Sequence, residues 1–431
     1  MDQVNARYTP HAVAILVLLW AALLTPAQEI SAASDPLQSK SASKLPFDLD
    51  VHGFLLGVVS GRTTGERPPG ADDLTLGEER LRFDLSASPE SGQPLVIVKG
   101  DLFHDAVANR LDDDLREAYV RYTKGSLDLS LGRQIVTWGV GDLFFINDVF
   151  PKDWAAFFSG LPMEYLKLGV DGLRARYSSE LVNGDFLVIP SFTPDNLPSP
   201  KRFSIFDPLS ALPKHRETEP SSRLSNTELA LRLYRQVWDF DASIYIYRGF
   251  WHEPSVRLDN LFSPTTATRF FPKLSVYGAS AQRNLLDGVL SLEMAYYDSA
   301  LPNSQYRFLV GYQRELWQDF IAGLQVYSQI RDHLSTDDFS LAVGYPRSEQ
   351  FVSTRITQLL DYQNWKLSLF AAYSPIHRDY FIQPEVSYRM TDSLSAYLGT
   401  NIFGGPRRTF FGQLRSDTAF FAMRFDFSLL S

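Results

Sequence analysis

The sequence predicts an all-β protein: a transmembrane antiparallel β-barrel of about eighteen strands, with sixteen strands as the alternative. Three observations support this fold class. Short segments alternate apolar and polar side chains, the connections between them alternate between short and long, and the one long apolar run stands at the N-terminus. A soluble β-sandwich or a solenoid would also contain alternating strands, but it has no reason to gather its long loops at one end.

The first residues have the three-part form of a secretory signal peptide. Arg7 precedes an apolar run at residues 12–24, which is too short to span a bilayer comfortably, and small residues follow up to Ala33. We therefore expect residues 1–33 to hold the signal peptide and its cleavage region. Residues 34–46 would form a short periplasmic lead, and residues 47–431 the barrel. A permanent membrane anchor is the alternative for the apolar run.

Residues 115–154 show the repeating unit most clearly, as a β-hairpin that leads into a long loop. Ala118, Val120 and Tyr122 alternate with more polar neighbours, which is the period-two pattern of a strand with one apolar face. Gly125 lies in a tight turn, and residues 127–132 then resume the alternation. One short turn followed by one long loop is typical of a transmembrane β-barrel hairpin.

The same unit repeats along the chain. The predicted strands are 47–59, 76–88, 95–104, 115–123, 127–137, 165–178, 185–192, 227–237, 240–250, 273–283, 289–298, 305–315, 320–329, 351–360, 365–373, 380–389, 394–401 and 418–428. Short turns, such as residues 284–288, alternate with longer connections, such as residues 138–164 and 193–226. An even number of strands with short periplasmic turns places both ends of the barrel in the periplasm.

Each predicted strand has one apolar and one mixed polar face. Residues 290, 292, 294 and 296, for example, form an apolar stripe that we expect to face lipid. The opposite faces would line the pore, and their predicted basic residues are Arg80, Arg82, Lys99, Arg121, Arg232, Arg307, Arg355, Arg389 and Arg424. Fewer acids share these faces, although the whole chain has a formal charge of −9. We place the compensating acids in loops, at residues 112–114 and 337–338.

A lumen with excess positive charge favours anions. The alternative for any single basic residue is that it pairs with a carboxylate on a neighbouring strand and adds no selectivity.

The connection at residues 138–164 is the candidate constriction. It is dense in aromatic residues, which would be a liability in water but could pack on the inner wall of the barrel. Its candidate constriction residues are Trp138, Asp142, Asp148 and Lys152. An extracellular cap is the alternative. The proline-rich connection at residues 193–226 is expected to form a second folded-in loop or a lid.

Three motifs within residues 115–154 carry a family resemblance: L-R-E-A-Y-V-x-Y, then L-G-R-Q-I-V-T-W-G, then D-V-F-P-x-D-W. They resemble a group of Gram-negative outer-membrane porin-like proteins and are similar, more loosely, to the alginate-export porins. The resemblance implies a passive channel, and for the alginate exporters a basic pore that passes an acidic polysaccharide. It also implies that Arg133 and Gln134 lie at the pore-side rim. Because simple alternation from Leu131 turns Arg133 outward, this placement requires a β-bulge near Gly132.

The sequence shows no signs of catalytic chemistry. There is no cysteine, which excludes disulfides and thiolate sites, and the seven histidines are scattered without metal-ligand spacing. We therefore expect no enzyme, no metal, no cofactor and no nucleic-acid partner. An outer-membrane hydrolase is the distant alternative.

The predicted function is a channel in the bacterial outer membrane for passive diffusion of hydrophilic, anionic solutes. Its partners would be the membrane lipid and lipopolysaccharide together with small anions; the oligomeric state is not predicted. The alternatives are an export pore for an acidic polysaccharide and a barrel scaffold that encloses or anchors a partner protein.

Overall fold

The computed structural model describes residues 47–67, 73–200, 202–205, 207, 209–260, 262–301, 303–332 and 347–430. The predicted signal peptide (1–33), the periplasmic lead (34–46) and the acidic pair at 337–338 lie outside these residues. None of the helices described in these ranges is long and apolar enough to cross a membrane.

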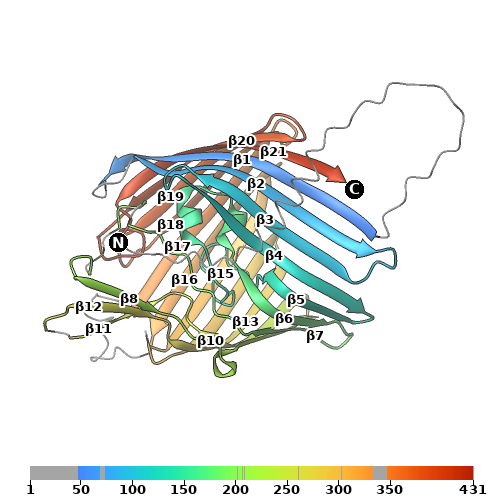
Figure 1. The fold of residues 1–431 in the computed structure, drawn as a ribbon, viewed down its shortest axis with the longest axis horizontal. Coiled ribbons are helices and arrows are strands. Elements are labelled where there is room, and N and C mark those ends of the chain that lie inside the picture. Colours follow the sequence, from blue (N-terminus) through green and yellow to red (C-terminus); the bar gives the residue numbers. More distant parts are fainter. Residues whose placement is uncertain are drawn as a thin grey trace, which may run out of the picture. The chain divides into compact units, whose positions relative to one another are not determined.

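Eighteen strands of the described residues form one antiparallel sheet that closes on itself, as Figure 1 shows. The fold class predicted from the sequence is therefore confirmed. The strands are β1 (Phe47–Gly65), β2 (Leu74–Pro89), β3 (Leu95–Asp105), β4 (Arg110–Lys124), β5 (Leu127–Ile135), β6 (Gly169–Tyr177), β7 (Asn183–Ile189), β9 (Glu228–Val237), β10 (Phe240–Phe250), β13 (Lys273–Leu285), β14 (Gly288–Asp298), β15 (Gln305–Trp317), β16 (Phe320–Arg331), β17 (Ser348–Leu360), β18 (Trp365–Tyr373), β19 (Tyr380–Arg389), β20 (Leu394–Gly404) and β21 (Ser416–Leu430).

The sheet has no free edge because its first and last strands pair. β1 bonds to β2 on one side and to β21 on the other, with Leu55 opposite Leu81 and Phe425. The start of β1 and the end of β21 lie at the end of the barrel that carries the short turns (Figure 1). Two of these turns, at Trp238-Asp239 and Leu286-Asp287, hold both central residues at positive φ, as two-residue hairpin turns of the favoured hand require.

Three further strands lie outside the barrel wall, in connections that the sequence analysis described as loops. β8 (Lys214–Thr218), β11 (Ser255–Leu258) and β12 (Thr266–Phe270) form a separate three-stranded sheet. β11 and β12 make an antiparallel hairpin, and β8 adds to β12 in parallel. The sheet thus joins the connection after β7 to the connection after β10 (Figure 1).

Side chains alternate across the wall as predicted. Met294, Val310 and Val326 occupy outward positions on β14, β15 and β16, with Val310 opposite Val326, and all three are exposed. Their neighbours Ala295, Leu309 and Tyr327 point inward and are buried. An exposed apolar belt around a closed sheet matches the needs of a wall in lipid, where water cannot satisfy unpaired backbone groups.

A charge placed in this belt tests the assignment of faces. Val310→Arg should destabilise the barrel in lipid vesicles by about 2–4 kcal/mol, because the cation would sit in hydrocarbon near the midplane. Gln313→Arg, on the inward face of the same strand, should cost much less. Urea unfolding of both variants in vesicles measures the difference. Equal losses of stability would contradict the assignment.

Candidate functional site

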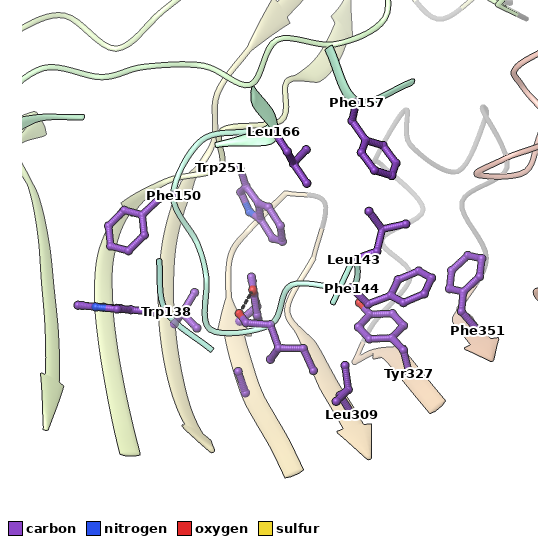
Figure 2. Packing of buried hydrophobic residues seen from close by; sticks show 14 of the residues in the cluster. Trp138, Leu143, Phe144, Phe150, Phe157, Leu166, Trp251, Leu309, Tyr327 and Phe351 are labelled. Carbon is purple, nitrogen blue, oxygen red and sulfur yellow. Dashed lines mark hydrogen bonds between the residues drawn. The ribbon is translucent and has the colours of Figure 1, made fainter. Parts of the chain in front are cut away.

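The connection between β5 and β6 lies inside the barrel. We call residues 136–168 the internal segment; it includes the helix α2 (Trp154–Ser159) and the 3₁₀ turn η1 (Met163–Leu166). Figure 2 shows its apolar side chains against the inner wall. Phe144 stacks on Tyr327 and Phe351, with ring centroids 5.1 and 4.8 Å away, and the Trp138 ring meets the Phe150 ring edge to face at 5.1 Å.

The helical part of the internal segment packs on the last strands of the barrel. Asp153 caps α2 by accepting a hydrogen bond from the Ala156 amide at 2.7 Å, and Gly160 ends it in the left-handed conformation. A Cβ at residue 160 would collide with the Phe420 ring, so this position also requires glycine for space. The Phe158 ring contacts Phe381 at 5.6 Å. The segment therefore spans the lumen from one side to the other.

A buried carboxylate on β14 anchors the other half of the internal segment. Glu293 accepts hydrogen bonds from the Val140 amide (3.0 Å), the Asn147 amide (2.6 Å) and the Asn147 side chain (2.9 Å). Charge-assisted bonds of this kind are roughly twice as strong as neutral ones. A Cβ at residue 278 on β13 would collide with the Asn147 side chain, so the glycine at this position allows Asn147 to approach the wall. Glu293 is not among the predicted site residues, because alternation predicts an inward face but not a partner.

The four residues predicted to line the constriction differ in their surroundings. Asp142 is half-buried and pairs with Arg355 on β17 at 3.2 Å. Asp148 and Lys152 are buried and pair with each other at 3.0 Å, and Asp148 also pairs with Lys167. Trp138 is buried and donates to Asp185 at 3.1 Å. Asp142 alone of the four is accessible, whereas the other three hold the segment together.

Arginines surround Tyr165 of η1. The guanidinium carbons of Arg80, Arg82 and Arg116 lie 4.6, 5.2 and 4.9 Å from the centre of its ring. Arg80 pairs with Glu78 and with Asp101, and Arg82 pairs with Asp101 and donates to the Tyr165 hydroxyl at 3.0 Å. Only 5% of the Arg80 side chain and 4% of the Arg82 side chain are exposed. The structure thus buries two residues that the sequence analysis assigned to an open pore surface.

Arg116 is a member of this cluster that sequence reasoning missed. It donates to the backbone carbonyls of Glu164 at 2.6 Å and Lys167 at 2.9 Å, so it ties η1 to the wall. Alternation predicts an outward side chain here. A β-bulge shifts the register of β3 and β4 after Lys99, and this extra residue turns Arg116 inward next to Glu117.

Other predicted pore-lining residues remain accessible as ion pairs. Lys99 pairs with Glu117 at 3.0 Å, and Arg121 lies 3.8 Å from Asp128. Arg424 lies 3.1 Å from Glu164 and 2.8 Å from Asp426.

Three predicted basic residues have other partners. Arg232 donates to Ser243 and lies over the Tyr234 ring, and Arg307 lies 4.1 Å from the centre of the Tyr297 ring. Neither has a carboxylate within ion-pair distance among the described residues. Arg389 donates to the Gln363 carbonyl at the short-turn end.

The predicted excess of positive charge in the lumen is largely absorbed by pairing. Asp112 and Asp114 belong to β4, opposite Phe103 and Asp101 on the inward face, and not to a loop as predicted. Further inward carboxylates that the sequence analysis left out pair with arginines. They are Glu78, Asp105, Asp128, Glu164 and Asp185. Burial and pairing depend on neighbours from distant strands, which a count of residues per face does not include.

The implied placement of Arg133 at the pore-side rim is corrected. β4 and β5 pair without a shift from Lys124–Leu127 to Ala118–Arg133, so the expected bulge is absent from this pairing. Arg133 shares the outward face with Leu131 and pairs with Asp171 on β6 at 3.0 Å. Gln134 faces inward and is buried, and its amide points at two backbone carbonyls.

The connection after β7 covers part of the internal segment from the long-loop end. Asp195 accepts hydrogen bonds from the Lys152 amide at 2.7 Å and from the Trp154 indole at 3.3 Å. Burial raises the pKa of this carboxyl to about 7. Arg202 pairs with Asp105 of β3, and Ile205 forms a β-bridge with Leu414. These contacts fit the predicted alternative of a lid over the lumen.

No family model and no curated protein matches this sequence. Solved structures do match its fold. OccK9 (OpdG) of Pseudomonas aeruginosa superposes with a TM-score of 0.57 at 9% identity, covering 89% of this chain and 99% of that one. A BenF-like porin from Pseudomonas fluorescens Pf-5 gives 0.55 at 10% identity, with 89% and 99% covered, and OccAB3 of Acinetobacter baumannii gives 0.55 at 9%, with 89% and 100% covered. At these identities the likeness establishes the fold. The looser similarity to alginate-export porins gains no support from these structures.

Removing the Glu293 anchor should loosen the internal segment. Because the chain has no cysteine, Ile146→Cys places a single thiol at a fully buried position beside Asn147. Glu293→Ala removes three charge-assisted hydrogen bonds, each worth roughly 1.5–3 kcal/mol, so this thiol should be labelled at least about tenfold faster by a water-soluble reagent.

The matched control for this experiment is Glu385→Ala. Glu385 is an inward carboxylate on β19 that makes no hydrogen bond to the internal segment among those described, so its loss should leave the labelling rate unchanged. An unchanged rate in Glu293→Ala would show that aromatic packing alone holds the segment.

Proposed function

We propose that the chain forms a channel in the bacterial outer membrane through which small hydrophilic solutes diffuse passively, with anions preferred. It would act on no bond of the solute. The observation that carries this proposal is the internal segment: it narrows the lumen of a closed barrel and leaves charged groups accessible where it does so. The apolar belt supports a membrane location, and the fold is shared with a solved BenF-like porin.

Glu164 marks the most accessible part of the narrowing. This carboxylate is 40% exposed, lies 3.1 Å from Arg424 and 3.4 Å from Arg82, and stands beside the exposed side chain of Met163. A passing anion could interact with Arg424 in place of Glu164. Walls of low dielectric strengthen such interactions compared with open water.

The anion preference rests on the arginines that pairing does not neutralise. Arg232 and Arg307 contact aromatic rings and hydroxyl groups, and neither forms an ion pair among the described residues. Guanidinium groups stay charged throughout the physiological pH range. The preference should therefore be modest, because most other inward charges are paired.

The two alternative functions both need space inside the barrel that the internal segment fills in part. An export pore for an acidic polysaccharide needs a wide polar passage, whereas aromatic side chains of the internal segment fill part of this lumen. A scaffold that encloses a partner protein needs the same space. Under either alternative, the conductance of the isolated barrel for small ions would differ from that of a narrow pore.

Planar-bilayer recordings across a salt gradient test the proposal. The wild-type protein should conduct and show a modest preference for anions. Glu164→Gln removes one negative charge at the narrowing, and at about 6 Å in water-like surroundings this amounts to roughly 0.7 kcal/mol, so the anion-to-cation permeability ratio should rise about threefold.

The control for the recordings is Asp287→Asn in an exposed short turn, which should leave the ratio unchanged. A cation-selective wild type would refute the anion preference. A barrel that inserts but never conducts would favour the scaffold.

A further inference from the structure

Two exposed cations stand together on the outer wall of the barrel, at the long-loop end of β10 and β13. Arg248 is opposite Ser275, and Lys273 is opposite Phe250, two residues further along. Arg248 and Lys273 are therefore diagonal neighbours on one face of the sheet, within reach of each other's long side chains. Both side chains are exposed.

This face points outward, away from the lumen. On β10 it also carries the exposed Ile244 and Ile246, whereas the intervening Tyr245 and Tyr247 are buried inside the barrel. On β13 it carries the exposed Tyr277, which is opposite Ile246. The two cations thus stand directly beyond the apolar belt, where aromatic side chains mark the boundary between hydrocarbon and head groups.

Neither cation has an acidic partner among the described residues. No ion pair or side-chain hydrogen bond joins Arg248 or Lys273 to a carboxylate there. Asp298, opposite Ser275, is an exposed diagonal neighbour of Lys273, but its carboxylate accepts a hydrogen bond from Ser304. Arg133, another arginine on the outward face, pairs with Asp171. A cation at the edge of hydrocarbon is costly unless an anion or the interface satisfies it.

Three further cations lie on one face of the small sheet formed by β8, β11 and β12. The hairpin β11–β12 lies in the connection between β10 and β13, and its register aligns Arg257 with Thr268 and, on β8, with Arg216. Lys214 lies on the same face of this small sheet, two residues from Arg216. The three cations are exposed, and the strand positions on this face carry no carboxylate.

We propose that this strip binds the phosphate groups of an outer-leaflet glycolipid of the lipid A class. We define the strip by Arg248, Lys273 and Ser275; Arg257, Arg216 and Lys214 add positive charge on the small sheet that extends from the connection between the same two strands. Guanidinium and ammonium groups match the charge and the acceptor oxygens of a phosphate, and the serine hydroxyl adds a donor. Acyl chains of the same lipid lie against Ile244, Ile246 and Tyr277. The proposal rests on the outer-membrane location, and it does not depend on conduction.

Binding of purified lipid A to the full-length barrel in detergent tests the site. The probe is diphosphoryl lipid A, with the same lipid stripped of its phosphates as comparison. Arg248→Gln combined with Lys273→Gln should weaken binding roughly thirtyfold, which corresponds to about 1 kcal/mol for each basic residue at an anionic lipid surface. The dephosphorylated lipid should bind the wild type at least as weakly as the phosphorylated lipid binds this variant.

A second variant removes the same charge elsewhere. Lys124→Gln with Arg235→Gln neutralises two exposed cations at the short-turn end of the barrel, and lipid A should bind this variant as tightly as the wild type. Equal affinity of the Arg248–Lys273 variant and the wild type would overturn the proposal, as would equal losses in the two variants. Bilayer conductance of the Arg248–Lys273 variant should match the wild type, so the result is separate from the test of the channel.

Discussion

Closure of the sheet is the constraint on which the rest of the structure depends. A wall in hydrocarbon cannot leave backbone donors unpaired, so the strand that begins the barrel must bond to the strand that ends it. The pairing of β1 with β21 achieves this and fixes the direction of every side chain in the wall. Because successive residues alternate, one face becomes the apolar belt and the other faces the lumen. The internal segment therefore packs against a lumen wall whose side chains are determined by this alternation.

Two kinds of contact hold the internal segment inside the barrel. Aromatic pairs such as Phe144 with Phe351 each contribute about 0.5–1.5 kcal/mol beyond their buried area, and the Glu293 carboxylate fixes the backbone at one point. Ion pairs beneath the segment, such as Arg80 with Asp101, are almost fully buried. Breaking such a pair leaves a buried charge, so these arginines position η1 and do not contact solutes. In the proposed channel, the selectivity would depend on the groups that remain exposed, such as Glu164.

Sequence periodicity predicted the wall well because every second residue of a strand in lipid must present an apolar side chain to the hydrocarbon. The stripe at residues 290–296 is set by local alternation, and the structure reproduces it. The lumen is different, because its contacts join distant strands. The bulge that turns Arg116 inward, the pairing of Arg82 with Asp101 and the strand β8 in a long loop all depend on such contacts. Counting bases on one face therefore overstated the free charge, while the aromatic density of residues 138–164 correctly pointed to the segment that packs inside.

In the proposed channel, solutes pass beside η1, at Met163 and Glu164. A single cysteine at residue 163 tests it directly, because the natural chain has none. In a planar bilayer, a bulky anionic thiol reagent should reduce the current of Met163→Cys. The same reagent should leave the current of Tyr362→Cys unchanged, because Tyr362 is exposed in a short turn at the end of the wall. Complete labelling of Met163→Cys with an unchanged current would contradict the claim.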